Sequence, residues 1–277
     1  MQVRDALGSK LELERPPVRI VSLVPSLTET LFALNLAGNV VGVTRFCVEP
    51  AKLVEPLPRV GGTKNPNLGA IAELAPDIVI ANAEENRKID VERLRALGIP
   101  VFVTYPRSVA SAVETILNLG QILARAREAA MLARRIVRVV SGIETALGIR
   151  NKIQLRVFCP IWKKPWMTFN QDTYAHDVLR LMGFCNVFGD RSERYPKVTL
   201  EEALALDPEV ILLPDEPYRF TDSDALQLKT ALPPDLSRRL LLISGRDLHW
   251  YGAHMAVGLL ALAERLGRVR ASMQPVH

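Results

Sequence analysis

The side chains best suited to binding a ligand are aromatic, and they gather where predicted strands end. Trp162 and Trp166 lie in the loop after the first predicted strand of the second half, Tyr195 precedes a predicted helix, and Trp250 and Tyr251 follow a later strand. In parallel α/β sheets, ligands bind outside the carboxyl ends of the strands. Aromatic rings there can stack on a large flat ligand, each contributing about 0.5–1.5 kcal/mol beyond area burial. The alternative is that one or two of these rings fill the core.

The first half offers polar loops at similar places. Residues 44–49 and 61–67 follow predicted strands or precede helices, and residues 82–87 begin directly after a strand. Glu84 and Glu85 could accept hydrogen bonds from amide groups of a ligand. They could equally form the solvated start of a helix, and the sequence leaves both interpretations open.

Signatures of catalysis are missing from the sequence. It contains no GxGxxG after a strand, no GxxxxGK[ST] phosphate loop and no GxSxG elbow. We therefore expect no catalytic residues and a protein that is not an enzyme.

A metal site built from side chains is also not expected. The sequence has four histidines, His176, His249, His254 and His277. His249 and His254 are five residues apart, which does not place them on one helical face. A site of three histidines and a carboxylate is conceivable, but unrelated surface and cleft histidines are the preferred interpretation.

Composition is ordinary for a soluble globular protein of 277 residues, with 48% hydrophobic and 23% charged residues and a net charge of +5. The densest basic stretch, residues 125–138, has no interleaved aromatic residues, so we expect a solvated helix face and no nucleic-acid binding. Cys47, Cys159 and Cys185 cannot all pair, which excludes a disulfide-built scaffold.

No apolar run approaches the roughly 20 residues that a membrane span needs. Residues 1–15 alternate polar and apolar residues and lack the apolar core of a signal peptide. The expectation is a chain that is cytoplasmic as written or a mature form.

The elements that must position these side chains follow an α/β pattern. Short apolar runs predict strands, and stretches of helical period predict helices between them. Strands are predicted at residues 19–24, 40–43, 77–81 and 101–105 in the first half, and at 155–159, 209–213 and 240–244 in the second. Helices are predicted at residues 27–36, with Ser26 or Thr28 as the N-cap, at 90–97, ending at Gly98, and at 172–182 and 251–266.

A long helix is predicted between the two halves, at residues 126–147. Its apolar residues form one stripe: Leu132, Ile136, Val139, Val140, Ile143 and Leu147. Such a helix spans roughly 33 Å and can act as a rigid connector. The predicted division is an N-terminal lobe at 1–125, a connecting helix at 126–148 and a C-terminal lobe at 149–277.

One sequence element occurs in both halves. Residues 68–80 read LGAIAELAPDIVI and residues 200–212 read LEEALALDPEVIL. In each, a predicted helix runs into a proline eight residues after its first leucine, and an acidic residue and an apolar strand follow. The equal spacing favours a duplicated lobe plan, with a ligand cleft between two similar lobes.

Several segments carry a family resemblance that covers nearly the whole chain, in order. They are RIVSLVPSLTETLFAL, VVGVTRFC, PRVGGTKNPNL, PDIVIAN, VTLEEALALDPEVILL and SGRDLHWYGAHM. They resemble the periplasmic binding proteins for cobalamin and ferric siderophores, the helical-backbone metal receptors. The resemblance implies the class III substrate-binding-protein fold, α/β with two parallel-sheet lobes bridged by one long helix. It also implies a periplasmic monomer that captures a metal chelate between its lobes and delivers it to an ABC transporter permease.

The resemblance also implies site residues. Carried over by position, the cleft-lining residues are Phe46 or Cys47, Thr63, Asn82, Trp166, Tyr195 and Asp247. With Trp162, Trp250 and Tyr251 they form the predicted ligand-binding set. The family docks to its transporter through one surface glutamate on each lobe, and Glu201 fits the second-lobe position. The first-lobe position falls on Gly69, which has no carboxylate.

Three ligand hypotheses follow. The first is cobalamin or a related corrinoid, which is close to neutral and prefers aromatic and amide contacts. The second is a ferric siderophore or haem, for which Arg45, Arg246, Tyr251 and His249 could serve. The third is a cytosolic metal-chelate carrier, sensor or accessory enzyme. Trp166→Ala and Tyr195→Ala should weaken a corrinoid strongly, whereas Arg246→Ala should dominate for a ferric chelate.

Overall fold

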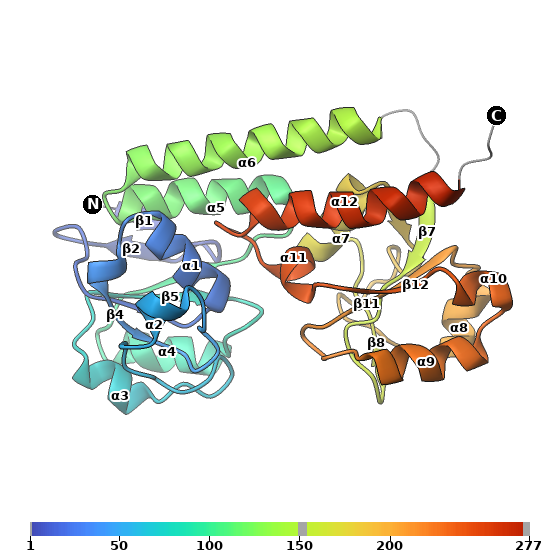
Figure 1. Ribbon diagram of the computed structural model, residues 1–277. Coiled ribbons are helices and arrows are strands. Elements are labelled where there is room, and N and C mark those ends of the chain that lie inside the picture. The colour runs from blue at the N-terminus through green and yellow to red at the C-terminus, as the bar shows by residue number, and fades with distance from the viewer. Residues whose placement is uncertain (1, 149–153, 274–277) are drawn as a thin grey trace. The chain divides into compact units, whose positions relative to one another are not determined.

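The computed structural model describes residues 2–148 and 154–273 and divides into two compact units (Figure 1). Unit 1 comprises the residues up to 106, residues 110–135 and residues 251–254. Unit 2 comprises residues 107–109, residues 136–250 and the residues from 255 onward. The lobe boundaries given above from the sequence stay a prediction.

Unit 1 is built on a four-stranded parallel sheet. Its strands are β3 (Ile20–Ser22), β4 (Val40–Val43), β5 (Ile78–Asn82) and β6 (Val101–Thr104), in the order β4-β3-β5-β6. Every residue of β3, β5 and β6 is buried, as expected of strands covered on both faces. All four strands lie where the sequence predicts them.

Unit 2 repeats this sheet. Its strands are β7 (Leu155–Phe158), β9 (Phe184–Asn186), β11 (Val210–Pro214) and β12 (Leu240–Ile243), all parallel, in the order β12-β11-β7-β9. In both units the first of the four strands lies between the second and the third, and the fourth follows the third. The fold is therefore α/β with two parallel sheets of the same topology, which confirms the predicted class.

The repeated sequence element forms the same structure in both units. Helix α3 (Leu68–Glu73) and helix α8 (Leu200–Ala205) are each followed by a residue in the left-handed region, Ala75 at φ 42° and Asp207 at φ 50°. That residue reverses the chain before the proline and so directs it into the next strand.

An arginine closes the C-terminus of each of these helices. Arg19 donates from Nη2 to the carbonyl of Leu74 at 2.7 Å, and Arg156 donates from Nε to the carbonyl of Asp207 at 2.6 Å. These carbonyls would otherwise lack a partner at the helix end.

The acidic residue after each proline holds the neighbouring strand. Asp77 Oδ2 accepts from the backbone N–H groups of Val18 at 2.8 Å and Arg19 at 2.9 Å. Glu209 Oε2 accepts from the backbone N–H of Arg156 at 2.9 Å. The proline–acid pair seen in the sequence is thus a junction between helix and sheet.

The long helix α6 spans Ala126–Leu147, as predicted, and is unbroken in Figure 1. The division into units falls inside it, after Arg135. Its predicted stripe is its covered face: Ile136 and Ile143 are buried, whereas Met131 and Val137 off the stripe are 60% and 51% exposed.

Helix α1 (Pro25–Ala33) corrects one prediction. Its N-cap is Val24, with no side-chain cap, so Ser26 and Thr28 are not the cap. Proline at the first helical position fixes the start, because its φ is already helical and it lacks an N–H to satisfy. Thr28 Oγ1 instead donates to the carbonyl of Val24 at 3.0 Å, and lies 2.8 Å from Ser22 Oγ.

The last helix is also shifted. Helix α12 spans Met255–Met273 rather than 251–266, because Gly252 has φ 95° and cannot be helical. Residues 251–254, which we call the 251–254 segment, pack in unit 1. The amide of Ala253 donates to Thr30 Oγ1 at 3.0 Å, and His254 Nδ1 lies 3.9 Å from Glu29 Oε1.

The remaining elements are mostly short. They are β1 (Gln2–Arg4), β2 (Lys10–Glu12), η1 (Ala37–Asn39), α2 (Ala51–Val54), α4 (Lys88–Ala96), α5 (Val109–Ile122), α7 (Tyr174–Leu181), β8 (Trp166–Met167), β10 (Lys197–Val198), α9 (Asp222–Ala231), α10 (Pro234–Ser237) and α11 (Gly245–His249). Sequence reasoning missed the antiparallel pair β1–β2 and the helix α5. Within the described ranges, no helix is both long and apolar enough to cross a membrane.

Candidate functional site

The most exposed aromatic side chain of unit 2 lies at the carboxyl end of β7. Trp162 is 44% exposed, and its ring meets Tyr218 in a T-shaped contact, with centroids 5.6 Å apart and planes at 71°. This geometry leaves part of the indole open to solvent while its orientation is held by a neighbouring ring.

The contact continues inward as a chain of rings. Tyr218 packs on Phe220 at 4.7 Å, Phe220 stacks on Trp166 at 6.0 Å and 9°, and Trp166 meets Phe158 at 6.5 Å. Phe158 and Phe220 are buried core residues, and Trp166 packs half-buried against that core. Trp166 therefore contributes to the core of unit 2, and Trp162 is the outermost ring of this row of aromatic side chains.

The loop from 215 to 221, which we call the 215–221 loop, touches all three tryptophans of the sequence. It contacts Trp162 through Tyr218 and Trp166 through Phe220. Trp250 Nε1 donates to Glu216 Oε2 at 3.0 Å. The guanidinium of Arg246 lies 4.5 Å from the centre of the Trp250 ring.

Tyr195 and Asp247, two further predicted site residues, are half-buried in unit 2. The guanidinium of Arg194 lies 5.9 Å from the Tyr195 ring and is held by Asp172 at 2.9 Å. The backbone N–H of Asp247 donates to Ser244 Oγ at 3.1 Å, the N-cap of α11.

In unit 1 the loop after β4 contains Phe46 and Cys47, the two alternatives for one predicted cleft-lining position. Phe46 is 49% exposed, with the Arg45 guanidinium 4.9 Å from its centroid. Cys47 is buried, its Sγ 3.2 Å from the hydroxyl oxygens of Thr28 and Thr44. Burial raises the pKa of the Cys47 thiol. Of the two, Phe46 is the residue at the surface.

Asn82 is committed to the fold of unit 1. Its side chain is buried, donates to Thr104 O at 3.1 Å, and accepts from the backbone N–H groups of Glu84 at 2.8 Å and Glu85 at 3.1 Å. This amide organises the turn after β5. Thr63, also in unit 1, is half-buried. Its backbone carbonyl accepts a hydrogen bond from Asn86 Nδ2 at 2.9 Å.

Tyr251 is buried, and His249 is half-buried. Tyr251 is buried in unit 1, with its hydroxyl 3.2 Å from Thr104 Oγ1, and burial raises its pKa well above the ordinary value. In unit 2, burial lowers the pKa of His249 to about 4. Its Nε2 is buried and has no hydrogen-bond partner among the residues that the structure describes.

Two further predictions concern charge and metals. Glu201 is exposed in the first turn of α8, where its own backbone N–H and the Thr199 hydroxyl lower its pKa. Gly69 occupies the equivalent place in α3.

Among residues 2–148 and 154–273, no group of three or more His, Cys, Asp or Glu side chains could hold a metal. His277 lies outside the described residues.

Comparison with known proteins places this geometry in a family. The family model described as "Periplasmic binding protein" matches residues 20–232. The vitamin B12-binding protein of Vibrio cholerae is 28% identical over 196 residues, which are 71% of this chain and 70% of that protein.

Solved structures share the fold. The crystal structure of the periplasmic vitamin B12-binding protein of Vibrio cholerae superposes with a TM-score of 0.80 at 23% identity, covering 94% of this chain and 99% of that one. The periplasmic haem-binding protein of Roseiflexus sp. RS-1 superposes with a TM-score of 0.76 at 22% identity, covering 90% and 97%.

Proposed function

Because the chain belongs to the periplasmic binding protein family, we propose that it is a receptor for cobalamin or a related corrinoid. It is a binding protein and not an enzyme, as the sequence predicts. The family is one of periplasmic binding proteins, and this chain is similar to a vitamin B12-binding protein.

Trp162 is the observation that carries the proposal. An indole that is 44% exposed and held edge-on by Tyr218 offers a prepared apolar surface at the carboxyl end of β7. A corrin macrocycle is large, flat and close to neutral, so it gains from stacking and area burial without needing a compensating charge. In unit 1, the exposed Phe46 is proposed as a second aromatic contact.

A ferric siderophore or haem is the second candidate. The exposed Arg45 and the half-buried Arg246 favour an anionic chelate, and a solved relative by fold is a haem-binding protein. Tyr251 and His249 count against it, because a side chain that ligates iron must reach the ligand, and Tyr251 is buried, as is the Nε2 atom of His249.

Paired variants distinguish these candidates. The purified chain is titrated by calorimetry with cyanocobalamin, aquocobalamin and haemin, and the series is repeated with Trp162→Ala, Arg246→Ala and Leu226→Ala. Leu226 is 67% exposed on α9 and serves as the matched apolar control. For a corrinoid receptor, Trp162→Ala weakens cobalamin binding and the other two change it little. Tight haemin binding that Arg246→Ala abolishes would replace the proposal with the second candidate.

Docking to an ABC transporter permease is proposed to use Glu201. The side chain is exposed at the start of a short capped helix and is charged at neutral pH. Glu201→Lys is expected to leave ligand affinity unchanged and to reduce stimulation of the cognate transporter's ATPase. Equal stimulation by both proteins would remove Glu201 from the docking surface. We propose that the receptor acts as a monomer, which sedimentation tests.

A further inference from the structure

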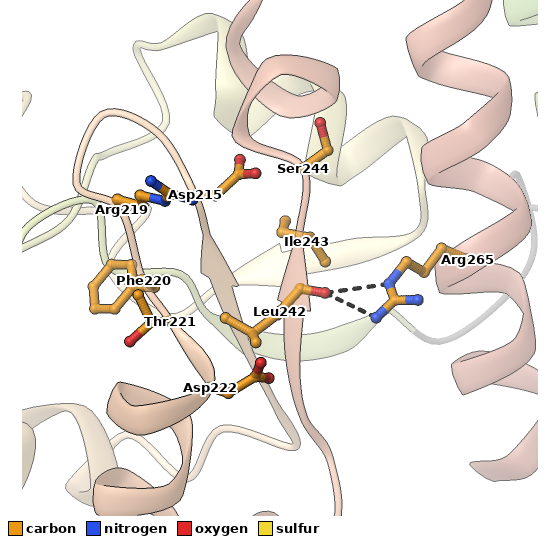
Figure 2. A pocket seen from close by; sticks show the side chains of 9 residues that line it. All are labelled: Asp215, Arg219, Phe220, Thr221, Asp222, Leu242, Ile243, Ser244 and Arg265. Atoms are coloured by element: carbon orange, nitrogen blue, oxygen red, sulfur yellow. Dashed lines mark hydrogen bonds between the residues drawn. The ribbon is translucent and has the colours of Figure 1, made fainter.

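Unit 2 contains a pocket of about 430 Å³ that the proposed function does not use (Figure 2). It lies at the carboxyl ends of the paired strands β11 and β12, where Asp215 and Ser244 follow the strands. Its volume is within the range of small-molecule sites, and this end of a parallel sheet is where such sites occur.

The charged side chains around the pocket balance. Figure 2 shows Arg219 and Arg265 on opposite sides of the pocket. In the same view Asp215 lies toward the top of the pocket and Asp222 toward the bottom. Two arginines and two aspartates carry no net formal charge. A balanced site disfavours a polyanion or a polycation, since each would leave like charges facing it.

Two of these charged groups are held in place. Arg265, on α12, donates from Nε at 3.2 Å and Nη2 at 3.0 Å to the carbonyl of Leu242 on the edge strand β12, which leaves Nη1 uncommitted by these bonds. Asp215 Oδ1 accepts from the backbone N–H of Gly245 at 2.6 Å. Fixed charges lose less entropy when they bind a ligand.

The other two charged groups are free. Within the described part of the chain, the side chains of Arg219 and Asp222 have no ion-pair or hydrogen-bond partner. They do not neutralise each other although they line one pocket. One cation and one anion are therefore available to a ligand on a surface whose remaining lining includes the apolar side chains of Phe220, Leu242 and Ile243.

We propose that this pocket is a second binding site, which takes a small zwitterion of the amino-acid class with an apolar side chain. An arginine can bind a carboxylate through two parallel hydrogen bonds, and an aspartate can accept from an ammonium group. The apolar part of the lining accommodates the ligand's side chain.

The 215–221 loop provides the means of detection. It lines the pocket with Arg219 and Phe220, and it contacts all three tryptophans through Glu216, Tyr218 and Phe220. A ligand that orders this loop is expected to change tryptophan fluorescence without touching an indole.

The test uses L-leucine with two analogues that each lack one charge. Isocaproate keeps the carboxylate and isoamylamine keeps the ammonium. The full-length protein is titrated with each, by calorimetry and by tryptophan fluorescence. We expect saturable binding of leucine, and no saturable binding of either analogue over the same concentrations. Arg219→Gln and Asp222→Asn are each expected to weaken leucine binding about tenfold.

Arg238→Gln is the matched control, because Arg238 is an exposed arginine of unit 2 outside the pocket. Circular dichroism confirms that each variant is folded. Absence of leucine binding, isocaproate binding as tightly as leucine, or equal loss in Arg238→Gln would each overturn the proposal. None of these results bears on cobalamin binding, which is titrated separately.

Discussion

Trp162 and Tyr218 meet edge to face, with ring centroids 5.6 Å apart, although they are 56 positions apart in the sequence. Tyr218 rests in turn on the buried Phe220. The exposed indole is thus oriented by the core of unit 2 rather than by its own loop alone. Because folding already orients the indole, a ligand that stacks on it causes little further loss of side-chain entropy.

Removal of the Trp162 ring should therefore affect ligand binding more than stability. Trp162→Ala is expected to weaken cyanocobalamin binding by about tenfold or more, because a stacking aromatic anchor is lost. The urea midpoint should shift little, since nearly half of the side chain is already exposed. Trp162→Phe, which keeps a ring, should recover most of the affinity. A variant that binds like the parent would remove Trp162 from the site.

Trp166 should behave in the opposite way. It stacks on Phe220 at 6.0 Å and meets the buried Phe158, so Trp166→Ala should leave a cavity and reduce the free energy of unfolding by about 2–4 kcal/mol. Urea denaturation followed by circular dichroism measures this. Unchanged stability together with weak ligand binding would instead place the ring at the ligand, as the family resemblance implies.

The 251–254 segment should tolerate no side chain at Gly252. Its φ is 95°, and a Cβ there would lie 2.1 Å from Thr30 Oγ1. Gly252→Ala should lower the free energy of unfolding by about 1–3 kcal/mol. Gly142→Ala is the matched control, because Gly142 lies inside α6 with open space around it and should gain about 0.5–1 kcal/mol. Equal effects of the two changes would contradict the strain argument.

Stability should depend on pH through His249. Burial lowers its pKa to about 4, whereas an unfolded histidine titrates near its ordinary pKa of about 6.5. The unfolded state therefore binds a proton first. Above about pH 6.5 His249 is neutral in both states and does not reduce the free energy of unfolding. As the pH falls toward 4, protonation of the unfolded state lowers that free energy by up to roughly 3 kcal/mol.

His249→Leu isolates that effect. Unfolding by urea at about pH 7.5 and about pH 5 should show a smaller loss of stability in the variant than in the parent. His176, whose pKa is also lowered by burial, acts in the same direction in both proteins and so cancels in the comparison. The same pH dependence in parent and variant would show that folding does not lower the pKa of His249, and would contradict this prediction.

Much of the fold could be predicted because its signals are local. The stripe from Leu132 to Leu147 gave the bounds of α6 to the residue. The apolar runs gave seven of the eight strands of the two parallel sheets, and the repeated helix–proline–strand element gave their duplication. These patterns depend on side-chain periodicity within one segment, which the sequence displays directly.

The missed features depend on distant contacts or backbone conformation. Strand β9, Phe184–Asn186, contains no continuous apolar run, because its last residue is an asparagine and its middle residue, Cys185, is exposed. Within the alternating N-terminal segment, Gln2–Arg4 and Lys10–Glu12 form the hairpin β1–β2 only because the two strands pair across a turn. Gly252 reads as part of a helix until its positive φ is known, since Trp250 to His254 has no proline or repeated glycine to mark a break.

The candidate site is harder to derive from the sequence than the fold. Composition and position indicate which residues stand at strand ends, but not which way they face. Asn82 follows a strand as predicted, yet its amide is used by Thr104 and the turn after β5. The pocket at Arg219 and Asp222 draws on three segments, and no local pattern connects them.

A calorimetric titration of the purified chain with cyanocobalamin tests the central claim most directly. The account predicts saturable binding with one cobalamin per chain at micromolar affinity or tighter, about −8 kcal/mol or more favourable. No heat of binding with cobalamin, in a protein that circular dichroism shows to be folded, would contradict the corrinoid proposal while leaving family and fold in place.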